Sequence, residues 1–415
     1  MYLCTEFYMM KGIKTIRLRG IMTGSLRVYA VGLLLLPLAM LGQRARYSLD
    51  FTLSKKNFAD TIAIVLEPNG SRVLLPVSIG GSSHLFLLDT GASHAVVYED
   101  AMIAGCEPVG TIDSYDANER VSRVPTVKLP PLTIGSLTLT GCQATVQRRR
   151  VRHGDIDGII GFDLVRKGLQ MKIDVENRRL ILSDRKKIFV KEPGYRLKYR
   201  LRWNVPYVEV SPFREYHETV RFDTGSPRLY VINKESFDKG EPLMANRRQI
   251  EGRCLGRWMM GFSGTEPRGE VVFLALDSLC VGGFAMRDVH TLSTQQGNSH
   301  VGAELLRYGA VTFIPNKKTM LFQPYTEEGS CTVGNSQVEK AVVPSDDGRP
   351  MIGLVWEGGE AFKAGFREGD IILKADGRDV GSFQDYRRYR PIKKHVYTFE
   401  VIDVLGYTKT VMATW

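Results

Sequence analysis

The feature that most constrains the fold of this 415-residue chain is an internal duplication. Leu75–Ser93 (LPVSIGGSSHLFLLDTGAS) and Val205–Ser226 (VPYVEVSPFREYHETVRFDTGS) each read as an alternating strand, a turn and an apolar strand that ends in Asp-Thr-Gly. A repeat of this kind sets the architecture of the whole chain. Three further pairs follow in the same order: Leu129–Val146 with Leu276–Leu292, Gly158–Val165 with Ser299–Leu306, and Val165–Ser183 with Leu306–Gln323.

Both copies consist of short runs of Val, Ile, Leu, Thr and Phe separated by Gly, Pro and Asn turns, a pattern typical of β-structure. We therefore expect a mainly β protein in which each copy forms one β-barrel lobe, the two lobes being related by a pseudo-twofold axis. Residues 43–190 are assigned to the first lobe and residues 191–326 to the second. Thr61–Leu66 is expected to be a first strand, although residues 43–70 could instead be a basic pro-segment.

Asp89 and Asp223 occupy equivalent places in the two copies, each after an apolar strand. Two carboxyl groups held close together cannot both ionise, so one stays protonated while the other acts as a base. Such a pair can activate a water molecule and protonate a leaving group without metal or cofactor. Supporting roles at the pair are expected for the residues that follow each aspartate: Thr90, Gly91, Thr224, Gly225 and Ser226.

Phe86–Ser93 (FLLDTGAS) and Asp157–Val165 (DGIIGFDLV) resemble the retropepsin group of aspartic peptidases, and Val220–Ser226 extends the likeness to a fused, two-lobed, pepsin-like arrangement over roughly residues 70–326. The resemblance implies an aspartic endopeptidase that cleaves polypeptide substrates. It also implies that Gly161 and Gly302 lie beneath the catalytic loops.

The resemblance further implies a hairpin flap over the substrate. Thr111–Arg123 is the candidate, with Tyr115 as a substrate-contacting residue or, alternatively, an exposed loop aromatic. A second flap is expected around Trp258–Gly269.

The second lobe departs from the family pattern at two positions. His300 replaces an apolar residue before Gly302, and Arg221 stands two residues before Asp223. Ser226 could hydrogen-bond the carboxylate of Asp223. These departures leave open a homodimeric enzyme that relies on Asp89 alone. The other alternative is a non-catalytic protein that binds peptides in the cleft and in a groove of the C-terminal domain described below.

The polar stretch of residues 327–340 reads as a linker, and residues 341–415 as a separate small α+β domain. Ile352–Asp379 (IGLVWEGGEAFKAGFREGDIILKADGRD) resembles a PDZ domain. The resemblance implies binding of peptide C-termini or extended segments by strand addition, with a groove formed by Met351, Ile352, Gly353 and Leu354. The alternative is a purely structural cap.

Val28–Leu41 (VYAVGLLLLPLAML) follows basic residues and has the length of a signal-peptide core. Residues 1–42 are therefore interpreted as a signal peptide or an N-terminal anchor of a bacterial exported protein, periplasmic or associated with the cell envelope, with a possible membrane tether through residues 28–41. The formal charge of +11 is partly N-terminal and otherwise scattered, and no nucleic-acid recognition pattern accompanies it.

The six cysteines include no CxxC and no Cys/His pair at ligand spacing, so no structural metal is expected. Buried free thiols are the favoured interpretation, with Cys106–Cys142 or Cys254–Cys280 as possible disulfides.

Overall fold

The computed structural model describes residues 49–67, 71–148, 156–244, 246–389, 392 and 394–414. The predicted signal segment, Val28–Leu41, lies outside these residues. Of the helices that are described, none has the length and apolar character needed to cross a bilayer.

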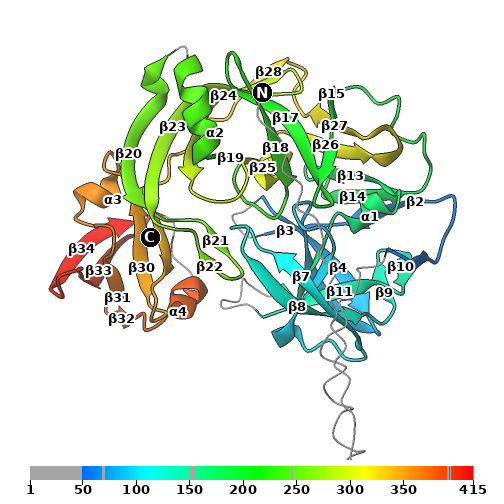
Figure 1. Ribbon diagram of the computed structural model, residues 1–415, viewed down its shortest axis with the longest axis horizontal. Coiled ribbons are helices and arrows are strands. Elements are labelled where there is room, and N and C mark those ends of the chain that lie inside the picture. The colour runs from blue at the N-terminus through cyan, green and yellow to red at the C-terminus, as the bar shows by residue number, and fades with distance from the viewer. Residues whose placement is uncertain are drawn as a thin grey trace, which may run out of the picture. The chain divides into compact units, whose positions relative to one another are not determined.

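The described chain is mainly β, as the sequence predicts, and its strands form barrel-like sheets (Figure 1). The first lobe, coloured blue to cyan-green, contains an eleven-stranded sheet in the order β1-β10-β9-β4-β5-β12-β6-β11-β8-β7, with β3 paired to β4. Its strands are β1 (Thr52–Leu53), β3 (Val65–Leu66), β4 (Val73–Ile79), β5 (Ser82–Leu88), β6 (Ala95–Tyr98), β7 (Glu107–Tyr115), β8 (Val121–Lys128), β9 (Leu132–Ile134), β10 (Leu137–Thr140), β11 (Gln143–Gln147) and β12 (Gly158–Ile160).

The second lobe, green to yellow in Figure 1, contains a nine-stranded sheet in the order β16-β17-β18-β25-β19-β24-β23-β20, with β28 paired to β24. Its strands are β16 (Arg200–Arg202), β17 (Val205–Phe213), β18 (Tyr216–Asp223), β19 (Tyr230–Asn233), β20 (Ile250–Gly256), β23 (Gly269–Val281), β24 (Phe284–Thr294), β25 (His300–Gly302) and β28 (Ser330–Thr332). A separate two-stranded hairpin consists of β21 (Met260–Gly261) and β22 (Gly264–Thr265).

The duplication seen in the sequence is also a duplication of strand pairing. In the first lobe β12 runs parallel to β5 and antiparallel to β6, and β11 is parallel to β6. In the second lobe β25 runs parallel to β18 and antiparallel to β19, and β24 is parallel to β19. Each aspartate therefore follows or ends the outer strand of an equivalent four-strand unit, β5-β12-β6-β11 in the first lobe and β18-β25-β19-β24 in the second.

The two lobes share a six-stranded sheet in the order β15-β27-β26-β13-β14-β2. Its strands are β2 (Ala59–Ala63), β13 (Gln170–Asp174), β14 (Arg179–Ser183), β15 (Tyr195–Lys198), β26 (Gly309–Ile314) and β27 (Thr319–Pro324). At its centre β13 of the first lobe pairs with β26 of the second. Buried aromatic rings pack beside this junction, with Phe162 and Phe313 in edge-to-face contact at 4.9 Å, so the lobes have one continuous core.

The helical segments are short. The α-helices are α1 (Asp163–Arg166), α2 (Lys234–Gly240), α3 (Glu360–Lys363) and α4 (Phe383–Arg388), and the 3₁₀ segments are η2 (Glu99–Ala101), η3 (Glu241–Leu243), η4 (Arg247–Gln249), η5 (Ala303–Arg307) and η6 (Pro315–Lys317). The segments α1 and η5 follow β12 and β25 respectively, so they too obey the duplication.

The C-terminal residues form their own sheet in the order β29-β30-β31-β33-β34, with β32 paired to β31 (Figure 1, orange to red). Its strands are β29 (Lys340–Pro344), β30 (Pro350–Val355), β31 (Ile371–Ala375), β32 (Arg378–Asp379), β33 (Val396–Ile402) and β34 (Thr408–Thr414). This sheet has a separate apolar core that includes Ile352, Phe366 and Phe399. A smaller cluster joins it to the second lobe, because Leu354 packs with Phe273 there. We refer to residues 340–414 as the C-terminal module.

The five cysteines within the described residues, from Cys106 to Cys331, are all free. Neither Cys106–Cys142 nor Cys254–Cys280 forms a disulfide.

Candidate active site

Asp89 and Asp223 lie together where the two lobes meet, each held by the same pattern of backbone hydrogen bonds. The Oδ1 atom of Asp89 accepts from the amides of Gly91 (2.8 Å) and Ala92 (3.1 Å). The Oδ1 atom of Asp223 accepts from the amides of Gly225 (3.0 Å) and Ser226 (3.3 Å). The carboxyl of Asp89 also hydrogen-bonds to that of Asp223. We call this pair the dyad.

The two threonines after the aspartates lock the loops to each other. The amide of Thr90 donates to the hydroxyl of Thr224, and the amide of Thr224 donates to the hydroxyl of Thr90, both at 3.0 Å. Each hydroxyl then donates to a carbonyl of the opposite lobe, Thr90 to Phe222 at 2.9 Å and Thr224 to Leu88 at 2.7 Å. Both threonines are fully buried, so this network is rigid and shielded from water.

The glycines of the two motifs are required by close approach. A Cβ atom on Gly91 would lie 2.4 Å from Cγ of Asp223, and one on Gly225 would lie 2.5 Å from Cγ of Asp89. No side chain fits at such distances. Glycine therefore lets each loop pass directly over the carboxyl group of the other.

Gly161 and Gly302 also pack against the dyad loops. A Cβ on Gly161 would meet the carbonyl oxygen of Ala92 at 2.8 Å, and one on Gly302 would meet that of Ser226 at 2.5 Å. Behind each loop the amide of the next residue bonds to the same carbonyl, from Phe162 to Ala92 and from Ala303 to Ser226, both at 2.8 Å.

Arg221 makes the two halves of the dyad electrostatically different. It is two residues before Asp223 on β18 and therefore on the same face of the strand. Its Nη2 lies 3.0 Å from Oδ2 of Asp223, and both side chains are 12% exposed. Its Nε is buried without a hydrogen-bond partner among the described groups. The sequence identifies Arg221 only as a departure from the family pattern, although its two-residue spacing from Asp223 could have predicted this contact.

The environments of the two aspartates shift their pKa values in opposite directions. Burial, the charge of Asp223 and the hydrogen bond to it raise the pKa of Asp89 to about 8. Burial would also raise the pKa of Asp223, but the positive charge of Arg221, aided by His300 and by hydrogen bonds, outweighs it and lowers that pKa. The dyad is thus a protonated Asp89 beside an ionised Asp223.

Ser226 differs from expectation, because its hydroxyl does not bond the carboxylate of Asp223. That hydroxyl lies 2.9 Å from Nε2 of His300, whose Nδ1 faces the carbonyl of Asn298 at 3.1 Å. Burial lowers the pKa of His300 to about 4, so the imidazole is neutral at neutral pH. Nδ1 then donates to Asn298, and Nε2 accepts from Ser226. The unusual histidine is a satisfied neighbour of the second loop.

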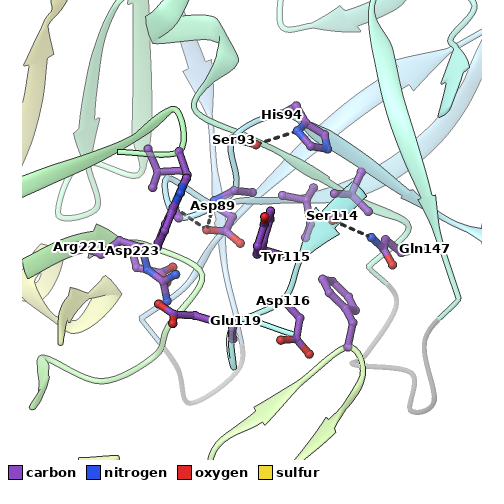
Figure 2. A pocket seen from close by; sticks show the side chains of 18 of the residues that line it. Asp89, Ser93, His94, Ser114, Tyr115, Asp116, Glu119, Gln147, Arg221 and Asp223 are labelled. Atoms are coloured by element: carbon purple, nitrogen blue, oxygen red, sulfur yellow. Dashed lines mark hydrogen bonds and ion pairs between the residues drawn. The ribbon is translucent and has the colours of Figure 1, made fainter. Parts of the chain in front are cut away.

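A cleft of about 210 Å³ opens on the dyad (Figure 2). The first lobe contributes apolar residues to its lining, among them Ala92, Val96 and Ile159. The second lobe contributes Trp203, Val205 and Arg221.

The hairpin β7–β8, which we call the first hairpin, covers this cleft and contains the predicted flap Thr111–Arg123. Tyr115 lines the cleft while remaining 59% exposed, and its ring stacks on Trp203 of the second lobe at 6.1 Å. Trp203 was not identified from the sequence.

The second hairpin, β21–β22, lies within the predicted second flap Trp258–Gly269 and contacts the tip of the first. The amide of Ser263 donates to Oδ2 of Asp116 at 3.0 Å. In return, Asn118 Nδ2 donates to the carbonyl of Gly264 at 3.0 Å, and Arg120 Nη2 to that of Thr265 at 2.7 Å. The two hairpins thus form a joined roof.

The groove predicted at Met351, Ile352, Gly353 and Leu354 is not open to strand addition. These residues belong to β30, which lies between β29 and β31 in its sheet. The pairing of β30 with β31 involves Met351. Further along β30, the carbonyl of Gly353 accepts a hydrogen bond from the amide of Arg257 in the second lobe at 2.7 Å. Two edges of this sheet pair with no other described strand, those of β29 and β34, and β29 is the one beside β30.

The described residues include no cluster of three or more His, Cys, Asp or Glu side chains arranged to hold a metal ion.

A protein-family model described as aspartyl protease matches residues 75–164, which include Asp89. Comparison with curated proteins gives no match. Together with the paired carboxyl groups, the family match supports an aspartic peptidase, a hydrolase of peptide bonds.

Similar solved structures include three that this chain resembles at low identity. Basic 7S globulin from soybean is 10% identical with a TM-score of 0.39, and the alignment covers 64% of this chain and 94% of the globulin chain. Conglutin gamma, a basic 7S globulin from lupine seeds, is 10% identical with a TM-score of 0.41, and the alignment covers 66% of this chain and 96% of conglutin gamma. An aspartic proteinase from Irpex lacteus is 12% identical with a TM-score of 0.41, and the alignment covers 64% of this chain and 97% of the proteinase.

Proposed function

We propose that this protein is an aspartic endopeptidase in which Asp223 is the general base and Asp89 the general acid. The observation that supports the proposal is the dyad itself: two mutually hydrogen-bonded carboxyls with opposite pKa shifts on interlocked loops. Groups with separated pKa values at one site can divide acid and base roles between them.

In the proposed reaction a water molecule between the carboxyls attacks the peptide carbonyl carbon. Asp223 takes a proton from the water while Asp89 gives its proton to the carbonyl oxygen, which produces a neutral gem-diol. Asp223 then protonates the amide nitrogen, a gem-diol hydroxyl returns a proton to Asp89, and the C–N bond breaks. The dyad ends in its starting protonation state, and no covalent enzyme intermediate is formed.

The test is cleavage of a mixed peptide library by the chain from Gln43 onward at pH 3–9, with Asp89→Asn and Asp223→Asn compared with the wild type. Each substitution is expected to lower cleavage by about a thousandfold or more, because either one removes an acid-base partner. Asp288→Asn, which changes an exposed aspartate on β24, is the matched control. Circular dichroism verifies folding. Cleavage that survives Asp223→Asn supports instead a homodimer that relies on Asp89.

The ion pair at the dyad favours a second candidate, a non-catalytic peptide-binding protein. Arg221 neutralises Asp223 and lowers its pKa, and a carboxylate of lower pKa is a weaker base. Binding of library peptides by a folded wild type that cuts none of them at any pH supports this candidate.

The C-terminal module is proposed to be a PDZ domain that recruits polypeptides. Gly365, with φ of 111°, follows the end of α3, and Gly369, with φ of 91°, precedes β31, positions typical of a helix-ending glycine and a turn glycine. Because β29 is the edge strand beside β30, an extended peptide would pair with Lys340–Pro344 rather than with β30.

Hydrogen exchange on the Asp89→Asn chain tests this recruitment without cleavage. A peptide with a free C-terminal carboxylate is expected to slow exchange in residues 340–344. Protection restricted to the two hairpins over the cleft identifies the module as a structural cap instead.

We further propose that the protein is exported, with residues 1–42 as its signal peptide or membrane tether. The composition of Val28–Leu41 supports this proposal. Cell fractionation followed by N-terminal sequencing is expected to find the protein in the envelope fraction. A purely cytoplasmic, unprocessed chain contradicts it.

A further inference from the structure

One side of the cleft beside Asp89 is apolar. Val96 on β6 and Ile159 on β12 line it, together with Ala92 of the first dyad loop. Val96 and Ile159 belong to an apolar cluster of the first lobe that also includes Leu87 and Tyr98. A concave apolar surface next to the reacting groups favours burial of an apolar side chain from a bound peptide.

The second lobe also contributes an apolar side chain to this region. Phe262 is between β21 and β22, at the tip of the second hairpin, and lines the same cleft. Its ring packs with Tyr98 at a centroid distance of 6.1 Å and an interplanar angle of 56°. Phe262 is partly rather than fully buried, so it borders the remaining space instead of filling it.

The residues on both sides of Phe262 are held against Asp116 of the first hairpin. The amide of Ser263 bonds to Asp116, and a Cβ on Gly261 would lie 2.4 Å from the same carboxylate. At the base of the hairpin, Glu266 is 1% exposed.

The carboxylate of Glu266 accepts hydrogen bonds from the segment that precedes the second hairpin and from the end of β24. Its Oε1 accepts from the amides of Trp258 and Met259, both at 3.0 Å. Its Oε2 accepts from the hydroxyl of Thr294 at 2.6 Å and the amide of Gln295 at 2.7 Å. A side chain supported in this way occupies a defined position, as a specificity determinant must.

We propose that Phe262 is a specificity residue that limits the size of the apolar side chain accepted beside Asp89. The subsite takes a medium aliphatic side chain, such as Val or Leu, next to the scissile bond, and discriminates against Phe and Trp. This inference rests on the proposed peptidase function, because it names the substrate class of the same cleft.

The test uses hexapeptides that differ only in the residue beside the scissile bond, which is Val, Leu, Phe or Trp. For wild type, kcat/KM is expected to be highest for Val or Leu. Phe262→Ala is expected to raise the Phe-to-Val and Trp-to-Val ratios of kcat/KM by about tenfold, since small changes in an apolar pocket have effects of that order. Phe262→Leu is expected to shift the ratios in the same direction by less, and it serves if the alanine variant fails to fold.

Leu255→Ala is the matched control, because Leu255 is an apolar residue of the second lobe that is 54% exposed and does not line the dyad cleft. It is expected to leave the ratios unchanged. Unchanged ratios in folded Phe262→Ala overturn the proposal. An equal rise for all four peptides also overturns it, because Phe262 would then obstruct the cleft without selecting among side chains.

Binding measurements separate this inference from the peptidase proposal. The same four sequences, made uncleavable by replacing the scissile amide with a hydroxyl-bearing isostere, are titrated calorimetrically into wild type and Phe262→Ala. A change of about tenfold in the Phe-to-Val ratio of Kd supports the subsite even if the wild type cuts nothing. An unchanged Kd ratio, or a change without size preference, contradicts the subsite even if the dyad variants abolish cleavage.

Discussion

Arg221 Nη2 lies 3.0 Å from Oδ2 of Asp223, whereas Asp89 has no ion pair with any residue that the structure describes. The lobes share a strand plan and the same backbone hydrogen bonds to each aspartate. The guanidinium group breaks this symmetry, because it favours the ionised form of the nearer carboxyl. The direction of proton transfer in the proposed reaction follows from this single contact.

The first prediction concerns the pH dependence of activity. With Asp223 ionised and Asp89 protonated up to about pH 8, kcat/KM is expected to hold through neutral pH and fall above about pH 8. Arg221 lowers the pKa of both carboxyls, so Arg221→Met is expected to move the acidic and the alkaline limbs to higher pH by about one unit or more. The measurement is kcat/KM from pH 3 to 10.

Arg202→Met is the control for this pH shift, since Arg202 lies over the Tyr207 ring at 5.2 Å and has no ion pair with Asp223. Identical profiles for Arg221→Met and wild type contradict the assignment of acid and base roles.

The second prediction concerns stability. Asp89 has a raised pKa in the folded protein, so it favours folding below its ordinary pKa of 3.8, and this contribution is lost as pH rises towards 8. Asp89→Asn does not titrate. Its advantage in free energy of unfolding over wild type is therefore expected to grow between pH 4 and pH 8, by at most about 1.4 kcal/mol per pH unit. Urea unfolding at several pH values measures it.

Asp223→Asn provides the contrast, because the lowered pKa of Asp223 stabilises the fold above its ordinary pKa and loses this effect in acid. Its substitution leaves Arg221 without its partner and is expected to cost about 3 kcal/mol at pH 7. Equal pH dependence in the two asparagine variants speaks against opposite protonation states.

The third prediction tests the close approach of the two loops. In Gly225→Ala the added Cβ would lie 2.5 Å from Cγ of Asp89. Because this distance is too short for two carbon atoms that are not bonded, the two loops must separate. A displacement near 1 Å is expected to lower kcat by about a hundredfold. Gly329→Ala is the matched control, because its Cβ would make one ordinary contact, 3.6 Å from the Tyr195 hydroxyl. Full activity in Gly225→Ala would show that the dyad tolerates a wider spacing.

The fourth prediction concerns the roof. Asp116→Asn can keep the bonds that Oδ1 accepts from the amides of Asn118 and Arg120, both at 2.9 Å, but turns an NH₂ group towards the amide of Ser263. Amide hydrogen exchange in the second hairpin is expected to accelerate, with little change in Tm. Asp113→Asn, an exposed aspartate on the first hairpin, is expected to have no such effect. Unchanged exchange in Asp116→Asn means that the hairpins are independent.

The sequence predicted the mainly β fold and the two motif positions, because a repeated strand pattern and repeated Asp-Thr-Gly loops are local signals. It did not assign Arg221 to Asp223, although alternation along a strand contains that information. The role of Ser226 could not be predicted, since the competing partner His300 comes from another strand. Phe262 is in a glycine-rich hairpin whose neighbour, Tyr98, is in the other lobe. The sequence also did not predict that β30 lies between β29 and β31, which leaves β29 at the edge of the sheet. Pairing between strands has no short-range signature in the sequence.

The six-stranded sheet shared by the lobes restricts how this protein can move. Moving one lobe away from the other would break the β13–β26 pairing and expose the buried aromatic residues beside it. Because both changes cost free energy, we expect no hinge motion between the lobes. Access for a chain of substrate must instead come from the hairpins above the cleft. The tips of the hairpins are joined by hydrogen bonds at Asp116, Asn118 and Arg120. We expect these tip contacts to open when a substrate enters, while Glu266 keeps the base of the second hairpin in place.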